Sequence, residues 1–232
     1  DLQTTIDSIE QIRVSEDIAA VGIVIIEDGQ PVWRGGFGTL AHDSDMPISD
    51  STIFRIGSIT KSFTSLAILK LAEQDKLELD DTISRWVPAD WYQNSWEKQQ
   101  PVKIANLLEH TAGFRDISKA EFDYNDSAPV SLETNLLHFK QTHTAAWPAG
   151  MHASYTNLGP GYAGYIVERS SNNSYESYVA EQIFRPLAML DSGFFISEEN
   201  RARLAAGYDT DGRTSIPYWH MVYRPFGGIN TT

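Results

Sequence analysis

Cysteine is absent from this sequence of 232 residues. The chain therefore has no disulfide framework, no thiolate metal site and no cysteine nucleophile. Long apolar runs are missing as well, because no stretch approaches the roughly 18 apolar residues that a membrane-spanning helix needs. We expect no transmembrane segment.

Basic residues are scarce relative to acidic ones. Lysine and arginine together number 18, aspartate and glutamate number 31, and the net charge is −13. This charge would repel phosphates, so we expect no nucleic-acid partner. The hydrophobic share of 41% and the charged share of 21% are typical of a globular protein. The length fits one or two domains.

The six histidines show no paired metal-ligand spacing. His138 and His143 are five residues apart, a separation that does not place two side chains on one helix face. We interpret both as solvated side chains, and we expect no metal site and no cofactor.

Hydrophobic periodicity and turn residues divide the chain into helices and strands. Apolar residues at helical spacing predict an amphipathic helix over 2–14. A β-hairpin follows, with strands over 19–26 and 31–37 on either side of a turn from Glu27 to Gln30. A helix from Ser58 to about Gln74 is apolar on most sides, which indicates a central position. Further helices are predicted near 104–109, 131–141, 157–171 and 174–184, and further strands at 193–196 and 204–208.

This order of elements predicts an α/β (α+β) fold in which a sheet domain is interrupted by a helical one. We assign residues 1–56 and 191–232 to the sheet domain. Residues 57–190 form the mostly helical domain, which carries both of the motifs described next.

The first motif is Ser58-Ile59-Thr60-Lys61, at the predicted start of the central helix. Three residues make nearly one helical turn, so the Ser58 and Lys61 side chains point the same way. A serine hydroxyl needs a base to become a nucleophile, and a lysine can serve if burial lowers its pKa. The alternative is that Ser58 only caps the helix and Lys61 is a surface charge. Taken alone, this pattern is common by chance.

The second motif is Tyr155-Thr156-Asn157, in a loop that opens another helix. A tyrosine close to a lysine can pass protons, and an asparagine amide can both donate and accept a hydrogen bond. The alternative is a helix-capping loop with a packing tyrosine.

Together with their flanks, the two motifs resemble a known superfamily. Four segments occur in order: FRIGSITKSFTSLAILKLAEQDKLELDDTISRWVP, LLEHTAGF, WPAGMHASYTNLGPGYAGYIVERSSNNSYESYV and IFRPLAMLDSGF. From Ala19 to Gly228 the chain resembles the serine β-lactamase and penicillin-binding-protein superfamily. The nearest resemblance is to the class C β-lactamase-like group, which includes esterases, D,D-peptidases and D-aminopeptidases. This resemblance implies the β-lactamase/transpeptidase-like fold.

The resemblance also implies roles for four residues. Ser58 would be the acylated nucleophile, and Lys61 would take or relay its proton. Tyr155 would be the general base for acylation and the acid for the leaving group. Asn157 would bind Lys61 and a substrate amide or carbonyl. Whether Lys61 or Tyr155 is the resting base stays open.

One departure from the family pattern concerns the third motif, Lys-Thr-Gly or His-x-Gly, which relatives carry on a strand well beyond the tyrosine. No such motif follows Tyr155, and the His110-Thr111-Ala112-Gly113 segment comes too early. We therefore expect the C-terminal strands of the sheet to be absent from this chain. Either a missing C-terminal segment or a second chain would complete the sheet.

The function implied is that of a serine hydrolase acting through a Ser58 acyl-enzyme. Its substrates would be β-lactams, D-amino-acid peptides or small esters, and the LLEHTAGF segment favours an esterase or peptidase. The alternative is a non-catalytic or inactive fragment of the same fold that serves as a binding or sensing module. The resemblance implies a periplasmic or secreted protein. Four aromatic residues are expected near the mouth of the site, as core packing or as a hydrophobic substrate wall: Trp86, Trp91, Tyr92 and Trp96.

Overall fold

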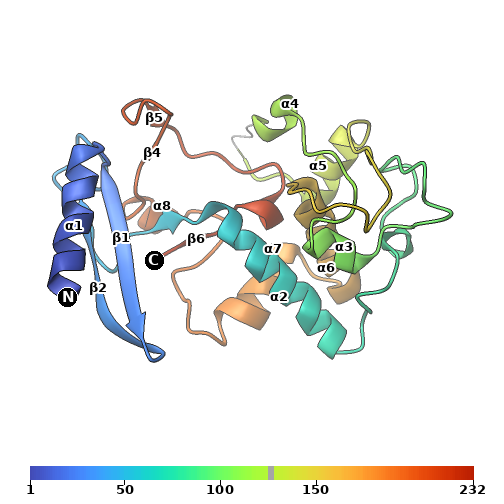
Figure 1. Cartoon of the computed structure of the whole chain (residues 1–232), viewed down its shortest axis with the longest axis horizontal. Helices are drawn as coiled ribbons and strands as arrows, with labels where there is room; N and C mark the ends of the chain where they lie inside the picture. The colour runs from blue at the N-terminus through green and yellow to red at the C-terminus, as the bar shows by residue number, and fades with distance from the viewer. Residues whose placement is uncertain (125–127) are drawn as a thin grey trace. The chain divides into compact units, whose positions relative to one another are not determined.

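The computed structural model describes residues 1–124 and 128–232 (Figure 1). Two compact units make up the chain. The first, called here the hairpin unit, contains Asp1–Phe54, Ile196–Tyr218 and Asn230–Thr232. The second, called the helical unit, contains Arg55–Phe195 and Trp219–Ile229.

The hairpin unit begins with α1 (Leu2–Ser15), which starts at Asp1, whose side chain accepts a hydrogen bond from the Thr4 N–H. Strands β1 (Ala20–Glu27) and β2 (Gln30–Gly38) then pair antiparallel, as predicted. Asp28 and Gly29 have φ angles of 51° and 75°. Two such residues are the preferred two-residue turn between twisted antiparallel strands. Helix α1 lies alongside the hairpin in Figure 1.

The rest of the hairpin unit contains little regular structure. Helix α8 (Glu198–Arg201) precedes a two-residue antiparallel pair of β4 (Gly207–Tyr208) and β5 (Ser215–Ile216). β6 (Asn230–Thr231) is equally short, and β3 (Phe54–Arg55) marks the passage into the helical unit.

Two strand predictions were wrong. Gly193 makes only an isolated bridge and residues 194–196 form no strand, while the Phe194 side chain is buried against Tyr175 and Phe184. The expected strand over 204–208 is reduced to β4, and Leu204 makes only an isolated bridge to Ile53.

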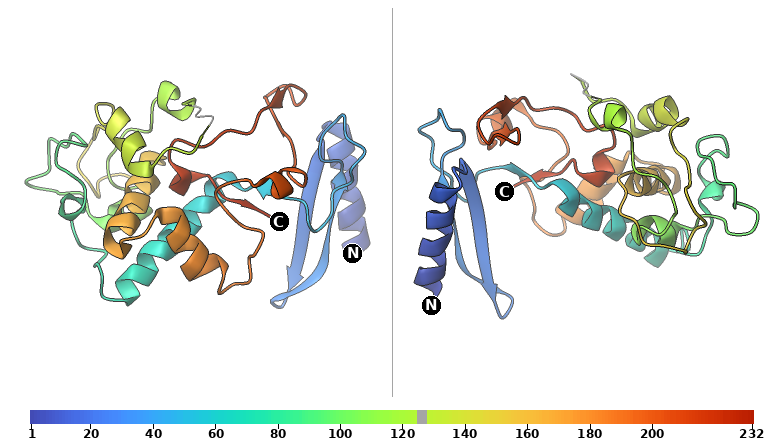
Figure 2. Two further views of the ribbon diagram at one scale, coloured as in Figure 1. Left: turned by 180° about the vertical axis from the view of Figure 1, so that it is seen from behind. Right: turned by 45° about the horizontal axis from the view of Figure 1, so that its top comes forward.

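The helical unit is organised around two long helices. Helix α2 (Thr60–Glu73) packs against α6 (Leu158–Ser171), and the two lie side by side in both views of Figure 2. Residues 158–167 of α6 are all buried, which places this helix at the centre of the core. The shorter elements are α3 (Ile104–Leu108), α4 (Lys119–Phe122), α5 (Leu132–Phe139) and α7 (Tyr175–Val179), with a π-helical turn at Ala180–Phe184 and 3-10 turns at Gly57–Ile59, Ile83–Arg85 and Arg224–Phe226.

The boundaries of the two units differ from those expected. Residues 191–195 and 219–229 belong to the helical unit and not to the sheet part of the chain. The reason is burial: Tyr223 and Phe226 lie in the core of the helical unit, and the Asn135 side-chain amide donates to the Val222 carbonyl over 2.7 Å. Within the described residues, no helix has the length and apolar character required to cross a bilayer.

Gly164 of α6 provides a test of this packing. A Cβ atom at this position would lie 2.2 Å from Cγ of Pro225, whose ring cannot rotate away. We expect Gly164→Ala to lower the free energy of unfolding by about 1–3 kcal/mol, the usual cost of overpacking. Urea unfolding measures this change. Gly207→Ala is the control, since a Cβ there meets nothing within 4 Å. Equal effects at the two positions would contradict the packing described here.

Candidate active site

Ser58 lies in the 3-10 turn that leads into α2, one turn before Lys61. The Lys61 Nζ atom donates a hydrogen bond to the Ser58 Oγ over 3.1 Å. Ser58 is exposed, while Lys61 is half-buried. The Ser58 side chain makes no capping hydrogen bond to the first turn of α2. A helix cap therefore does not explain this serine, and a solvated surface charge does not explain this lysine.

The Lys61 ammonium has an acceptor for each of its three hydrogens. Besides the Ser58 hydroxyl, it donates to the Asn157 Oδ1 over 2.9 Å and to the Phe226 carbonyl over 2.9 Å. The rings of Tyr155 and Phe226 lie 4.7 and 5.4 Å from Nζ. This geometry places Lys61 Nζ beside the Ser58 oxygen, where a positive charge would stabilise a developing alkoxide.

Tyr155 reaches the site from the loop before α6 and is 54% exposed. Its contact with Lys61 is through the ring, and in the described part of the chain no hydrogen bond joins its hydroxyl to Ser58. The structure thus brings together all four residues predicted from the sequence: Ser58, Lys61, Tyr155 and Asn157.

Two further residues hold the Tyr155 loop in place. The His110 ring lies against that of Tyr155, with centroids 4.4 Å apart and a tilt of 32°, and its Nδ1 accepts from the Thr156 N–H over 3.3 Å. Asp116 accepts from the Asn157 backbone N–H over 2.6 Å and from its side-chain Nδ2 over 3.3 Å. The sequence analysis assigned neither a role. His110 lies in the LLEHTAGF segment, which the sequence analysis used only as part of the family resemblance. No spacing rule connects Asp116 to Asn157.

The protonation of His110 gives a stability prediction. Burial lowers the pKa of His110, and the positive charge of Lys61 lowers it further, with Asp116 opposing. As the pH falls through about 6.5, the unfolded chain takes up a proton that the folded ring resists, so stability falls. We expect His110→Asn to lose part of this acid sensitivity. The measurement is the free energy of unfolding at several pH values. The exposed His152, changed to Asn, is the control, and the same effect from both changes would contradict the assignment.

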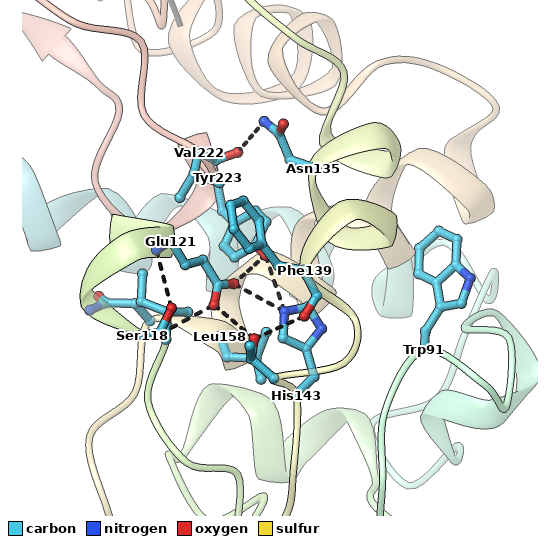
Figure 3. A network of polar contacts seen from close by, with 12 residues as sticks. Trp91, Ser118, Glu121, Asn135, Phe139, His143, Leu158, Val222 and Tyr223 are labelled. Carbon is cyan, nitrogen blue, oxygen red and sulfur yellow. Dashed lines mark hydrogen bonds and ion pairs between the residues drawn. The ribbon is translucent and has the colours of Figure 1, made fainter. Parts of the chain in front are cut away.

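A second polar cluster lies inside the helical unit (Figure 3). Glu121, His143, Tyr162 and Tyr223 are at most 1% exposed. The Glu121 Oε1 lies 3.0 Å from His143 Nε2 and accepts from the Tyr223 hydroxyl. The prediction of a solvated His143 was wrong. Helix α5 ends at Phe139, so helix-face spacing does not apply to His143, and its ring turns inward onto a buried carboxylate.

The four aromatic residues expected at the mouth of the site belong to the core or pack against it. Trp91 and Tyr92 are 5% and 6% exposed, and Trp86 and Trp96 pack against the same core. The Trp91 carbonyl accepts from the Tyr162 hydroxyl over 2.7 Å. Core packing therefore explains these side chains. Among the described residues, no group of three or more His, Asp or Glu side chains is arranged to hold a metal ion.

This geometry has a counterpart in known proteins. A family model described as Beta-lactamase matches residues 6–232. The chain belongs to the beta-lactamase family. It is 28% identical over 218 residues to Protein flp of Staphylococcus aureus strain MRSA252, which covers 93% of this chain and 43% of that protein. It is 25% identical over 214 residues to a Beta-lactamase of Pseudomonas fluorescens, which covers 92% of this chain and 56% of that protein.

Solved structures confirm the fold of this beta-lactamase-family chain. The octameric penicillin-binding protein homologue from Pyrococcus abyssi superposes with a TM-score of 0.84 at 30% identity. That match covers 100% of this chain and 54% of the homologue. The mixed helix and strand fold expected from the motifs is thus confirmed, as is the superfamily. The chain spans about half the length of the relatives it matches.

Proposed function

We propose that this chain carries the acylation site of a serine hydrolase, with Ser58 as the nucleophile. The observation that supports this most directly is the Lys61 ammonium, which contacts the Ser58 Oγ and the Asn157 Oδ1 at 3.1 and 2.9 Å. A charged group beside a serine oxygen favours the ionised form of the hydroxyl. Membership of the beta-lactamase family supports the same assignment.

The proposed reaction forms an ester on Ser58. The Ser58 Oγ attacks the substrate carbonyl carbon, and the hydroxyl proton passes to a deprotonated Tyr155 oxygen, because the Lys61 ammonium already carries three hydrogens. The carbonyl oxygen becomes an oxyanion next to the Ser58 N–H. When the tetrahedral intermediate collapses, the carbon–leaving-group bond breaks and the leaving group takes the proton. Water then attacks the ester and releases the acid. Asn157 would orient the substrate through the amide hydrogen that Asp116 does not accept.

The proposed substrates are small esters or D-amino-acid peptides, with β-lactams as the third class. The pocket distinguishes these three, and the acylation chemistry is common to them. A second candidate is a non-catalytic module that traps an acyl group. Intact-mass spectrometry with a fluorophosphonate detects the nucleophile, and a chromogenic ester then separates the two candidates. Turnover of the ester supports the hydrolase, and an ester adduct that is not released supports the module.

We also propose that further polypeptide, from the same chain or a second one, supplies the third motif and a second oxyanion donor. This chain covers only about half the length of its relatives, which supports the proposal. We expect the 232-residue chain to hydrolyse a chromogenic ester about 10²–10³-fold more slowly than a version extended past Thr232, the usual cost of one lost oxyanion donor. Equal rates would contradict the proposal.

A further inference from the structure

Glu121 and His143 form a buried pair with a defined hydrogen-bond direction. His143 Nδ1 lies 2.7 Å from the Tyr162 hydroxyl oxygen, and that hydroxyl donates to the Trp91 carbonyl. Because the Tyr162 hydrogen is used in this way, Nδ1 must be the donor to Tyr162. On the other side of the ring, Nε2 faces the Glu121 carboxylate at 3.0 Å. Nε2 and the Glu121 Oε1 therefore form a buried hydrogen-bonded pair.

The Tyr223 hydroxyl connects this pair to another part of the helical unit. It donates to the Glu121 Oε1 and lies 3.1 Å from His143 Nε2 (Figure 3). Burial raises the pKa of Tyr223, and the neighbouring Glu121 charge raises it further, so the hydroxyl stays a donor. Burial by itself would raise the pKa of Glu121, but hydrogen bonds from His143 and Tyr223 hold it below its ordinary value. The carboxylate thus has a fixed charge and fixed donors.

Tyr223 begins a short segment that ends at the proposed active site. Two residues later, the Pro225 carbonyl accepts from the Thr64 hydroxyl of α2 over 2.7 Å. The next carbonyl, that of Phe226, accepts from Lys61 over 2.9 Å. The buried pair and the Lys61 ammonium are therefore joined through four consecutive residues, with Tyr223 at one end and Phe226 at the other.

We infer that the Glu121–His143 pair is a positioning element that acts through the Tyr223 hydroxyl to fix the Phe226 carbonyl against Lys61. This inference rests on the proposed function. A buried carboxylate with its polar partners is costly compared with an apolar packing of the same volume, so it is weak evidence for stability. Holding the Phe226 carbonyl in place as an acceptor for Lys61 does require the fixed hydrogen bonds of this pair. Displacing a catalytic group by about 1 Å can reduce a rate by about 10²-fold.

The test compares two buried tyrosines of the helical unit in the full-length protein. Tyr223→Phe removes the hydroxyl that joins the pair to the segment, and Tyr165→Phe removes the hydroxyl of another buried tyrosine, which donates to Glu133 instead. Labelling by a fluorophosphonate, followed by intact mass, gives the acylation rate. We expect Tyr223→Phe to slow acylation about 10- to 100-fold and Tyr165→Phe to leave it within about threefold. In a Lys61→Ala background, Tyr223→Phe should have no further effect.

Equal slowing by the two variants would overturn the inference, because general loosening of the core of the helical unit would explain the loss. A further loss in the Lys61→Ala background would overturn it too. Crystal structures of both variants give a readout independent of activity. The contact between Lys61 Nζ and the Phe226 carbonyl, 2.9 Å here, should lengthen only in Tyr223→Phe. If the wild-type protein is not labelled, the proposed function fails, and this contact alone decides the inference. Should Tyr223→Phe not fold, Glu121→Gln replaces it, with the same expected slowing.

Discussion

Ser58→Ala should abolish covalent labelling by every acylating probe and leave the fold intact. The hydroxyl oxygen is the atom to which the acyl group would bond, and no other side chain replaces it. The folded state should lose little stability, because the Ser58 side chain is exposed and does not cap α2. The hydrogen bond that the Ser58 Oγ accepts from Lys61 contributes about 1 kcal/mol. Intact mass after incubation with a fluorophosphonate measures the labelling, and circular dichroism checks the fold.

The matched control is Ser62→Ala, which changes an exposed serine on the same helix and leaves Lys61 in place. This control protein should be labelled at the wild-type rate. An adduct on the Ser58→Ala protein would show that another residue is the nucleophile.

Lys61→Ala and Tyr155→Phe should each slow acylation by about 10²–10⁴-fold, the usual contribution of general acid–base help. Their effects should not multiply. The Lys61 ammonium lies 4.7 Å from the Tyr155 ring and donates to the Ser58 oxygen, so its charge would assist the same proton transfer that Tyr155 would carry out. Residues that act as a unit fail together. The measurement is the acylation rate of both single variants and the double variant.

A double variant whose loss equals the product of the single losses would show that Lys61 and Tyr155 act independently. Tyr92→Phe is a suitable control for the tyrosine change. Its hydroxyl is bonded to Glu97 over 3.2 Å, away from Ser58, so its removal should leave acylation unchanged.

The parts of the site that the sequence predicted are those with local geometry. Ser58 and Lys61 are three residues apart at the start of a helix. Helical geometry places both side chains on one side, where Lys61 Nζ lies 3.1 Å from the Ser58 Oγ. Placing Asn157 beside Lys61 required the family resemblance, since no local rule spans that separation. The Phe226 carbonyl could not have been predicted in either way, because every residue has a carbonyl and a backbone acceptor has no sequence signature.

The failures have the same physical cause. The run at 193–196 has the composition of a strand, but Phe194 packs against two aromatic rings of the core and no strand extends beyond the bridge at Gly193. His143 was judged from its spacing to His138, whereas its environment comes from Glu121, 22 residues earlier, and from Tyr223, 80 residues later. Tertiary contacts of this kind override local patterns.

The three acceptors of Lys61 come from parts of the chain that are far apart in sequence: Asn157 is 96 residues away and Phe226 is 165. We expect contacts between such distant residues to form after the local helices, because bringing distant segments together costs chain entropy. A molecule with helical content but an unformed Tyr223–Phe226 segment would therefore hold an unreactive serine. The rate of labelling by an acylating reagent would report the completed helical unit, while circular dichroism would already register α2 and α6. We therefore expect the rate of labelling at Ser58 to report when the Tyr223–Phe226 segment has formed.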